Sequence, residues 1–306
     1  MSTIKRTMGP SEWTMLLILS LVWGGSFFFF AVAVKHLPTF TIVFARVSLA
    51  TLLLWATVVA LGHGVPRSWA MWRQFLAMGL LNNAIPFSLI VYGQREIASG
   101  LAAILNATTP FFALIVANAL TSDEKLSANK LAGVAIGLLG VATMLGLDLL
   151  EHLGQALTAQ LAVLCASVFY GFATVYGRRF AANPPIVTAA GQTAGSTLIL
   201  LPLMLVIDRP WTLEPPPLQV WLALAGLATV CTAFAYVLFF AVLKRAGATN
   251  LALVTFLVPV SAIALGVLFL GEHLAPRHVL GMAGIGLGLA LIDGRLVSLL
   301  LRRPAV

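Results

Sequence analysis

Charge is scarce in this chain. Charged residues make up 9% of its 306 residues and hydrophobic residues make up 60%, whereas a soluble globular protein carries roughly 25% charged residues. A soluble core cannot hide so much apolar surface, so we expect lipid to surround the protein. The long apolar runs do not alternate with polar residues, which argues against a membrane barrel. The predicted fold class is therefore all-α integral membrane.

Side chains that carry chemistry are scarce too. The two cysteines, Cys165 and Cys231, form no CxxC pattern, and all ten acidic residues and five histidines fall in predicted loops, tails or span ends. A metal site, a hydrolase triad or a carboxylate proton relay would need such groups at depth. We therefore expect no catalytic residue, no metal ligand and no cofactor. A membrane-embedded enzyme or assembly protein stays an alternative.

Ten segments are apolar enough to cross a bilayer, which takes about 20 residues each. They cover about residues 13–33, 39–61, 74–92, 97–121, 130–147, 156–177, 186–207, 218–243, 247–270 and 278–292. They fill the chain and leave no room for a soluble domain. The first segment lacks a clear small-residue cleavage site, so we interpret it as a retained helix rather than a signal peptide.

The same five-segment unit occurs twice, over residues 13–147 and 157–293. Matching pairs lie at nearly constant offsets: Trp23-Gly24 with Tyr170-Gly171, Pro38 with Pro185, Pro110 with Pro259, Glu124 with Glu272, and Gly133 with Gly281. An odd number of spans inverts the second copy. Inverted repeats build a site between two halves that opens to either side in turn. The pattern predicts a transporter. Two GxxxG patterns, Gly133/Gly137 and Gly284/Gly288, predict close helix packing.

Positive charge predicts the orientation. With the N-terminus in the cytoplasm, thirteen of the 18 Lys and Arg residues lie inside, Arg46 lies within a span, and four lie outside: Lys35, Arg95, Arg209 and Arg277. The positive-inside rule then places both termini in the cytoplasm. A nucleic-acid-binding surface is a poor rival, because these charges are spread over short segments. The expected partners are the lipid bilayer and a small-molecule substrate. The sequence leaves the oligomeric state open and is compatible with a monomer.

Neutral polar and aromatic side chains occupy the span interiors. Polar groups that face lipid would lack partners, so most must face other helices or water. Asn82 and Asn83 lie about 100° apart on a helix, which favours a wet cavity beside them. Trp23 and Tyr170 are repeat-equivalent, so we expect them on opposite walls of one cavity.

Arg46 is the one charged residue inside a predicted span. It lies roughly 10–12 Å below the outer helix end, from its place eight residues after Pro38. One interpretation is that it snorkels to the interface or ties down backbone carbonyls. The other is that it holds a substrate carboxylate. Its counterpart in the second repeat is Thr193, so the charge is one-sided.

The motifs resemble the EamA-type repeat of the drug/metabolite transporter superfamily. They are Trp23-Gly24-Gly25-Ser26, Ala45-Arg46, the spans with Pro110 and Pro259, and Leu270-Gly271-Glu272-His273-Leu274. The resemblance implies a ten-helix basket with a central cavity lined by helices one, three, four, six, eight and nine. It is strongest to the YddG-type branch of bacterial aromatic amino-acid exporters.

The resemblance also identifies candidate site residues. It places on the cavity helices Trp23, Asn82, Asn83, Asn106, Tyr170, Thr232, Tyr236 and Thr255, which we take as candidate substrate-binding residues. Candidate hinge or packing residues are Gly24, Gly25, Pro86, Pro110, Gly171 and Pro259.

The expected function is export of amino acids, aromatic or otherwise apolar, or of similar small amphipathic metabolites, across the bacterial inner membrane by alternating access. A zwitterion suits a cavity rich in Asn, Thr and Tyr. Carriers of other metabolites or drugs are alternatives. Sugar phosphates and nucleotide sugars would need several buried cations, and only Arg46 is available. Because no acidic residue lies deep in a span, we expect facilitated transport or coupling through peripheral groups.

Overall fold

The chain is all-helical and crosses the membrane several times. The computed structural model describes residues 8–145, 156–261 and 275–293, and the regular structure within them is helical. Seven helices there are long and apolar enough to span a membrane, and two shorter apolar helices cover Ala128–Thr143 and Pro276–Ile292. The predicted all-α membrane fold is confirmed. The count of ten stays a prediction, because the ninth predicted span, 247–270, extends beyond the described residues.

The elements follow the two predicted units. The first comprises α1 (Pro10–Ala33), α2 (Thr39–Ala60), α3 (Trp69–Gly79), η1 (Leu80–Ala84), α4 (Ile85–Gly93), α5 (Ser99–Asn106), α6 (Thr109–Leu120) and α7 (Ala128–Leu145). The second comprises α8 (Leu157–Gly177), η3 (Arg178–Phe180), α9 (Pro185–Leu203), η4 (Met204–Asp208), η5 (Pro210–Thr212), α10 (Leu218–Ala228), η6 (Thr229–Phe234), α11 (Ala235–Ala252), a helical stretch at 254–261, and α13 (Pro276–Asp293).

Several predicted spans are interrupted. The segment 97–121 is divided into α5 and α6, and Pro110 stands in the first turn of α6, where its missing N–H costs nothing. α11 changes direction at Gly247, whose φ of 84° and ψ of 176° lie in a region that glycine adopts at low cost. Gly247 is the first residue of the predicted segment 247–270, so this break lies at the predicted boundary with the segment 218–243.

Three short helices of the described part, η1, η4 and η6, are π-helical, and two of them, η1 and η6, lie at matching places in the repeat. η1 follows α3, and η6 follows α10, at the offset that also relates Pro110 to Pro259. A π-helix shifts the backbone hydrogen bonds by one residue, and such turns are frequent at functional sites.

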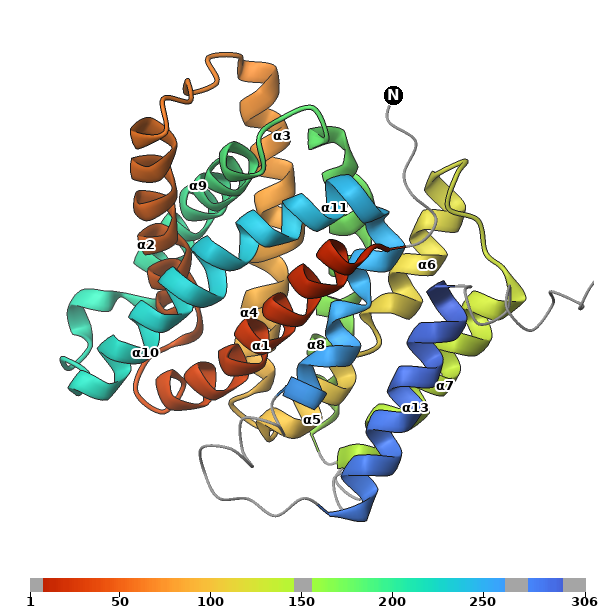
Figure 1. Ribbon diagram of the computed structural model, residues 1–306. Helices are drawn as coiled ribbons and strands as arrows, with labels where there is room; N and C mark the ends of the chain where they lie inside the picture. The colour runs from red at the N-terminus through yellow and green to blue at the C-terminus, as the bar shows by residue number, and fades with distance from the viewer. Residues whose placement is uncertain (1–7, 146–155, 262–274, 294–306) are drawn as a thin grey trace, which may run out of the picture.

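The two halves pack on each other reciprocally (Figure 1). α2 contacts α10 and η6 of the second half, while α9 contacts α3 and η1 of the first half, and α2 and α9 also contact each other. A two-fold relation between the halves requires this reciprocity. The inverted topology itself stays a prediction.

α7 and α13 pack side by side at one edge of the molecule (Figure 1). Their glycines allow backbone to approach backbone: a Cβ added to Gly133 would lie 2.6 Å from the Gly288 carbonyl oxygen, and one at Gly140 would lie 2.6 Å from the Ile285 nitrogen. The close packing predicted from the GxxxG patterns is confirmed.

Two glycines of α13 give a matched test of this packing. A Cβ at Gly288 would lie 2.5 Å from the Gly133 carbonyl oxygen, whereas one at Gly286 would meet nothing within 4 Å. Gly288→Ala should lower the melting temperature of the detergent-solubilised protein by about 3–8 °C through overpacking. Gly286→Ala should leave it unchanged or raise it slightly, since alanine favours helix. Equal melting temperatures for the two variants would contradict the packing argument.

Candidate functional site

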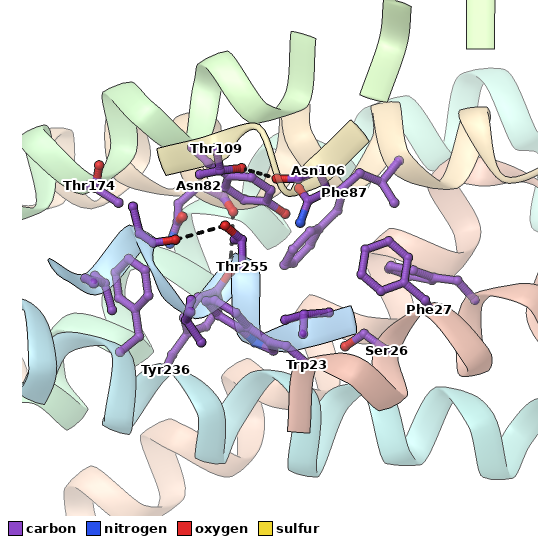
Figure 2. A pocket seen from close by; sticks show the side chains of 18 of the residues that line it. Trp23, Ser26, Phe27, Asn82, Phe87, Asn106, Thr109, Thr174, Tyr236 and Thr255 are labelled. Carbon is purple, nitrogen blue, oxygen red and sulfur yellow. Dashed lines mark hydrogen bonds between the residues drawn. The ribbon is translucent and has the colours of Figure 1, made fainter. Parts of the chain in front are cut away.

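A central pocket lies between the two halves (Figure 2). Its walls come from α1, α2, η1, α4, α5, α6, α8, α11 and the helical stretch after Leu253. Six of the eight candidate substrate-binding residues line it: Trp23, Asn82, Asn106, Tyr170, Tyr236 and Thr255. The cavity volume is about 60 Å³. One water takes about 10–15 Å³ on this scale, so a larger occupant must push wall side chains aside.

Aromatic rings dominate the lining, and the sequence argument identified only some of them. Phe27, Phe30, Phe87 and Phe239 join the aromatic candidates in the wall, and Ser26, Thr109 and Thr174 add hydroxyls. A run such as 27–30 covers every side of a helix, so its pattern alone does not say which rings face inward. Only the packing of α1 selects Phe27 and Phe30.

Trp23 is fixed from the second half. Its indole nitrogen donates to the Cys231 carbonyl oxygen at 3.2 Å. Its ring lies edge-on to Tyr236, with centroids 6.4 Å apart, and tilted against Phe239 at 6.0 Å. An aromatic pair at such a separation stabilises by about 0.5–1.5 kcal/mol beyond its buried area. Trp23 is therefore held in one orientation on the pocket wall.

The adjacent amides do not both face the pocket. Asn82 donates to Gln192 Oε1 at 3.0 Å and lines the cavity, whereas Asn83 donates to Ser196 Oγ at 2.7 Å and lies outside the lining. Tyr236 donates its hydroxyl hydrogen to Asn83 Oδ1. The cavity predicted beside both amides therefore adjoins Asn82 and not Asn83. Gln192 and Ser196, one turn apart on α9, supply the partners.

Thr232 is the other candidate that does not line the pocket. It lies in η6, is fully buried, and accepts a hydrogen bond from Arg46 Nε at 2.6 Å. Its own hydroxyl donates to the Leu227 carbonyl oxygen at 2.7 Å. Thr232 therefore positions Arg46, which does line the pocket.

Arg46 does not snorkel. It is 2% exposed, and its Nη2 donates to the Cys231 carbonyl oxygen at 3.1 Å. Its guanidinium carbon lies 3.8 Å from the ring centre of Phe87 and 5.1 Å from that of Phe30. Stacked rings of this kind favour a desolvated cation by about 2 kcal/mol. The cation is thus held against the wall of the pocket by neutral groups.

Comparisons with known proteins identify the family. The sequence pattern of the EamA-like transporter family matches residues 11–146 and 157–293. The chain belongs to the EamA-like transporter family. It is 24% identical to the transporter YoaV of Bacillus subtilis over 87% of this chain and 91% of that one. It is 26% identical to the inner membrane transporter YedA of Escherichia coli over 90% of this chain and 89% of YedA.

A solved structure shows the same fold. One crystal structure matches 96% of this EamA-like chain and 99% of its own, with a TM-score of 0.75 and 19% sequence identity. Protein PecM of Dickeya dadantii is 26% identical over 93% of this chain and 92% of PecM. The protein is thus a multi-pass membrane transporter, and the names of its relatives give no substrate.

The candidate hinge residues of this EamA-like transporter take different positions. α1 runs unbroken through Gly24 and Gly25, and Pro86 follows η1 in the first turn of α4. A Cβ on Gly171 would lie 3.0 Å from the Ala113 nitrogen, so α8 approaches α6 closely there. Pro259 lies in the helical stretch 254–261. Whether any of these residues acts as a hinge stays a prediction.

The sequence pattern marks Glu124 only as a repeated residue in a predicted loop. It is 8% exposed, and its carboxylate accepts from the backbone N–H of Ala248 at 3.1 Å and of Thr249 at 2.9 Å, and from the Thr249 hydroxyl. These amides begin the helix that follows the break at Gly247. A carboxylate there satisfies orphan N–H groups and favours the positive end of the helix. The sequence holds one signal for this contact. Glu124 recurs as Glu272 in the second repeat, and a glycine, Gly247, stands at the break in the helix.

The neighbouring Asp123 completes this contact between the halves. Arg178 donates to its two carboxylate oxygens at 2.9 and 2.6 Å and also lies 3.5 Å from Glu124 Oε1. The Arg178 hydrogen bond holds the pKa of Asp123 below its usual value. The loop after α6 is thereby tied to the end of α8 and to the second part of α11.

Proposed function

We propose that this EamA-like transporter exports amino acids with aromatic or other apolar side chains, or similar small amphipathic metabolites, across the bacterial inner membrane by alternating access. The observation that carries the proposal is the make-up of the pocket between the halves. Apolar residues, seven of them aromatic, form most of its wall, and the polar groups are amides, hydroxyls and Arg46. An amino acid with an apolar side chain offers matching surfaces to both kinds of group.

Each set of residues has a role in this proposal. Trp23, Phe87 and Phe239 contact the apolar side chain of the substrate. Asn106 offers its Oδ1 atom, which is buried and has no hydrogen-bond partner among the described residues, and Thr255 offers a hydroxyl. The likeness to the YddG-type aromatic amino-acid exporters belongs to the same proposal. Transport of other metabolites or drugs is the second candidate, since the lining is largely apolar.

The test is counterflow in liposomes that contain the purified protein. Liposomes loaded with phenylalanine or leucine should accumulate external labelled phenylalanine, whereas liposomes loaded with glucose 6-phosphate should not. Exchange driven by glucose 6-phosphate alone would overturn the proposal in favour of an anion carrier. Liposomes without the protein serve as the control.

The same liposomes test coupling. The described acidic residues lie at or beyond the ends of the predicted spans, so no carboxylate of the described part is placed to carry protons through the membrane centre. We expect a pH step across the liposome membrane to change the final accumulation of phenylalanine less than twofold. A tenfold uphill accumulation that collapses with a protonophore would contradict this expectation.

Orientation gives a further prediction. The charge bias places both termini in the cytoplasm, so residue 216 should face the periplasm and residue 68 the cytoplasm. In a background with Cys165 and Cys231 replaced by alanine, a membrane-impermeant thiol reagent should label Pro216→Cys in intact cells and miss Ser68→Cys. Permeabilised cells should label both. The reverse pattern in intact cells would overturn the orientation.

A further inference from the structure

We propose that Arg46 is the carboxylate-binding residue of the pocket, so that the substrate must carry one carboxylate. This deepens the proposed function and rests on it for the location of the substrate. The proposal starts from a buried cation whose charge is not balanced by any acid of the described residues.

Arg46 has no acidic partner among the described residues. The ionisable groups near it are the phenols of Tyr170 and Tyr236 and the thiol of Cys231. It contacts one hydroxyl, one carbonyl oxygen and two aromatic rings. A buried charge is costly unless it is paired, and a cation within a membrane protein ordinarily has a functional partner. An anion entering the pocket would supply the missing charge.

The guanidinium also has hydrogen-bonding capacity left over. A guanidinium carries five N–H donors. Nε donates to Thr232 and Nη2 to Cys231, while Nη1 makes no hydrogen bond to a residue of the described part. Since Arg46 lines the cavity, the remaining donors are available to an occupant. Two adjacent donors of a guanidinium match the two oxygens of a carboxylate.

The rest of the lining favours a single negative charge. Within the described residues, Arg46 is the only lysine or arginine that lines the pocket. A phosphate dianion would bring two charges and meet one, so a monocarboxylate fits better. The apolar rings beside Arg46 then require that the rest of the molecule be apolar.

A second group, the Asn106 side chain, is placed to bind the ammonium end of an amino acid. Asn106 is 7% exposed and lines the pocket, and its buried Oδ1 atom has no hydrogen-bond partner in the part of the chain that the structure describes. A carbonyl-type oxygen accepts from an ammonium group. We therefore expect the carboxylate to contribute most to recognition, and the ammonium to contribute less.

Four compounds with the same phenyl group separate these contributions: phenylalanine, phenylalaninamide, 3-phenylpropionate and phenethylamine. Affinities are measured by calorimetry on the full-length protein in detergent, and transport by counterflow. Phenylalanine should bind at least tenfold more tightly than its amide. 3-Phenylpropionate should bind better than phenethylamine.

Substitution of Arg46 should remove this preference. Arg46→Gln should weaken the binding of phenylalanine at least tenfold and change the affinity for phenylalaninamide less than threefold. Arg46→Lys keeps the positive charge but loses the adjacent N–H donors of the guanidinium, so it should retain part of the preference for phenylalanine. It also covers the case in which Arg46→Gln does not fold. Arg95→Gln is the control, because Arg95 is exposed, donates to the Leu37 carbonyl oxygen and lies outside the pocket lining.

The outcomes separate this inference from the proposed function. Two outcomes overturn the role of Arg46 and leave the proposed function standing. One is equal affinity of the wild type for phenylalanine and its amide; the other is an unchanged ratio of these two affinities in both Arg46 variants. Arg46-dependent binding of 3-phenylpropionate without binding of any amino acid overturns the amino-acid part of the proposed function and keeps the inference. Binding of only the amide and the amine, or of none of the four compounds, overturns both.

Discussion

Glu124→Ala should destabilise the protein by about 3 kcal/mol, because it leaves two buried N–H groups at the start of a helix without an acceptor. The backbone N–H groups of Ala248 and Thr249 both donate to this carboxylate, and the Arg178 guanidinium lies 3.5 Å away. Arg178 keeps its hydrogen bonds to Asp123, so most of the loss comes from the two backbone N–H groups. We expect the melting temperature in detergent to fall by roughly 6–12 °C.

Asp123→Asn is the matched control for this change. Asp123 is the adjacent acid and pairs with the same arginine, but its side chain is 47% exposed. Exposed ion pairs contribute about 0–1 kcal/mol, so Asp123→Asn should shift the melting temperature by no more than a few degrees. Glu124→Gln keeps one acceptor oxygen and should fall between the two. Equal shifts for Glu124→Ala and Asp123→Asn would show that the contact with the helix start contributes nothing.

Trp23→Ala should weaken binding of phenylalanine by at least tenfold and slow its counterflow to a similar extent. The indole forms part of the wall, and its loss also removes the bond to the Cys231 carbonyl oxygen. Stacking on the substrate ring is worth about 1 kcal/mol beyond the buried area, and the lost apolar contact adds to it; a total of about 1.4 kcal/mol corresponds to a tenfold change in affinity. Trp23→Phe keeps ring contacts and loses the hydrogen bond, so its effect should be intermediate.

Trp55→Ala provides the control for loss of a tryptophan. Trp55 stacks on Trp72, with ring centres 6.0 Å apart, and does not line the pocket. This change should lower the melting temperature and leave the affinity of the folded protein for phenylalanine unchanged. If Trp55→Ala weakened binding as much as Trp23→Ala, the loss would reflect general destabilisation and not a direct contact.

The apolar pattern was sufficient to predict the helices, because lipid exposure imposes long uninterrupted runs on the sequence. It did not reveal the breaks. A π-helix such as η1 changes backbone hydrogen bonding without changing hydropathy, so Leu80–Ala84 looks like the rest of its span. Repeated residues predicted the unit boundaries at 13–147 and 157–293, which stay a prediction; the family matches cover 11–146 and 157–293.

The candidate site was predictable to the level of the helix and less so to the level of the side chain. Trp23, Asn82 and Tyr236 line the pocket, but Asn83 turns away because α9 offers Ser196. Partners on a distant segment are invisible to a pattern confined to one helix. The same limit hid the contact between Glu124 and the amides after Gly247, which joins residues more than a hundred positions apart.

The matching π-helices have unequal surroundings, and this restricts how a molecule can sit between them. Beside η1, α9 contributes the neutral residues Gln192 and Ser196. Beside η6, α2 contributes the cation Arg46. The backbone therefore repeats while the chemistry does not. A bound molecule with two chemically different ends cannot be turned end over end without a change in its binding free energy. It therefore keeps one orientation. If the halves rock around it, the molecule leaves with the same end facing the same helix that it faced on entry.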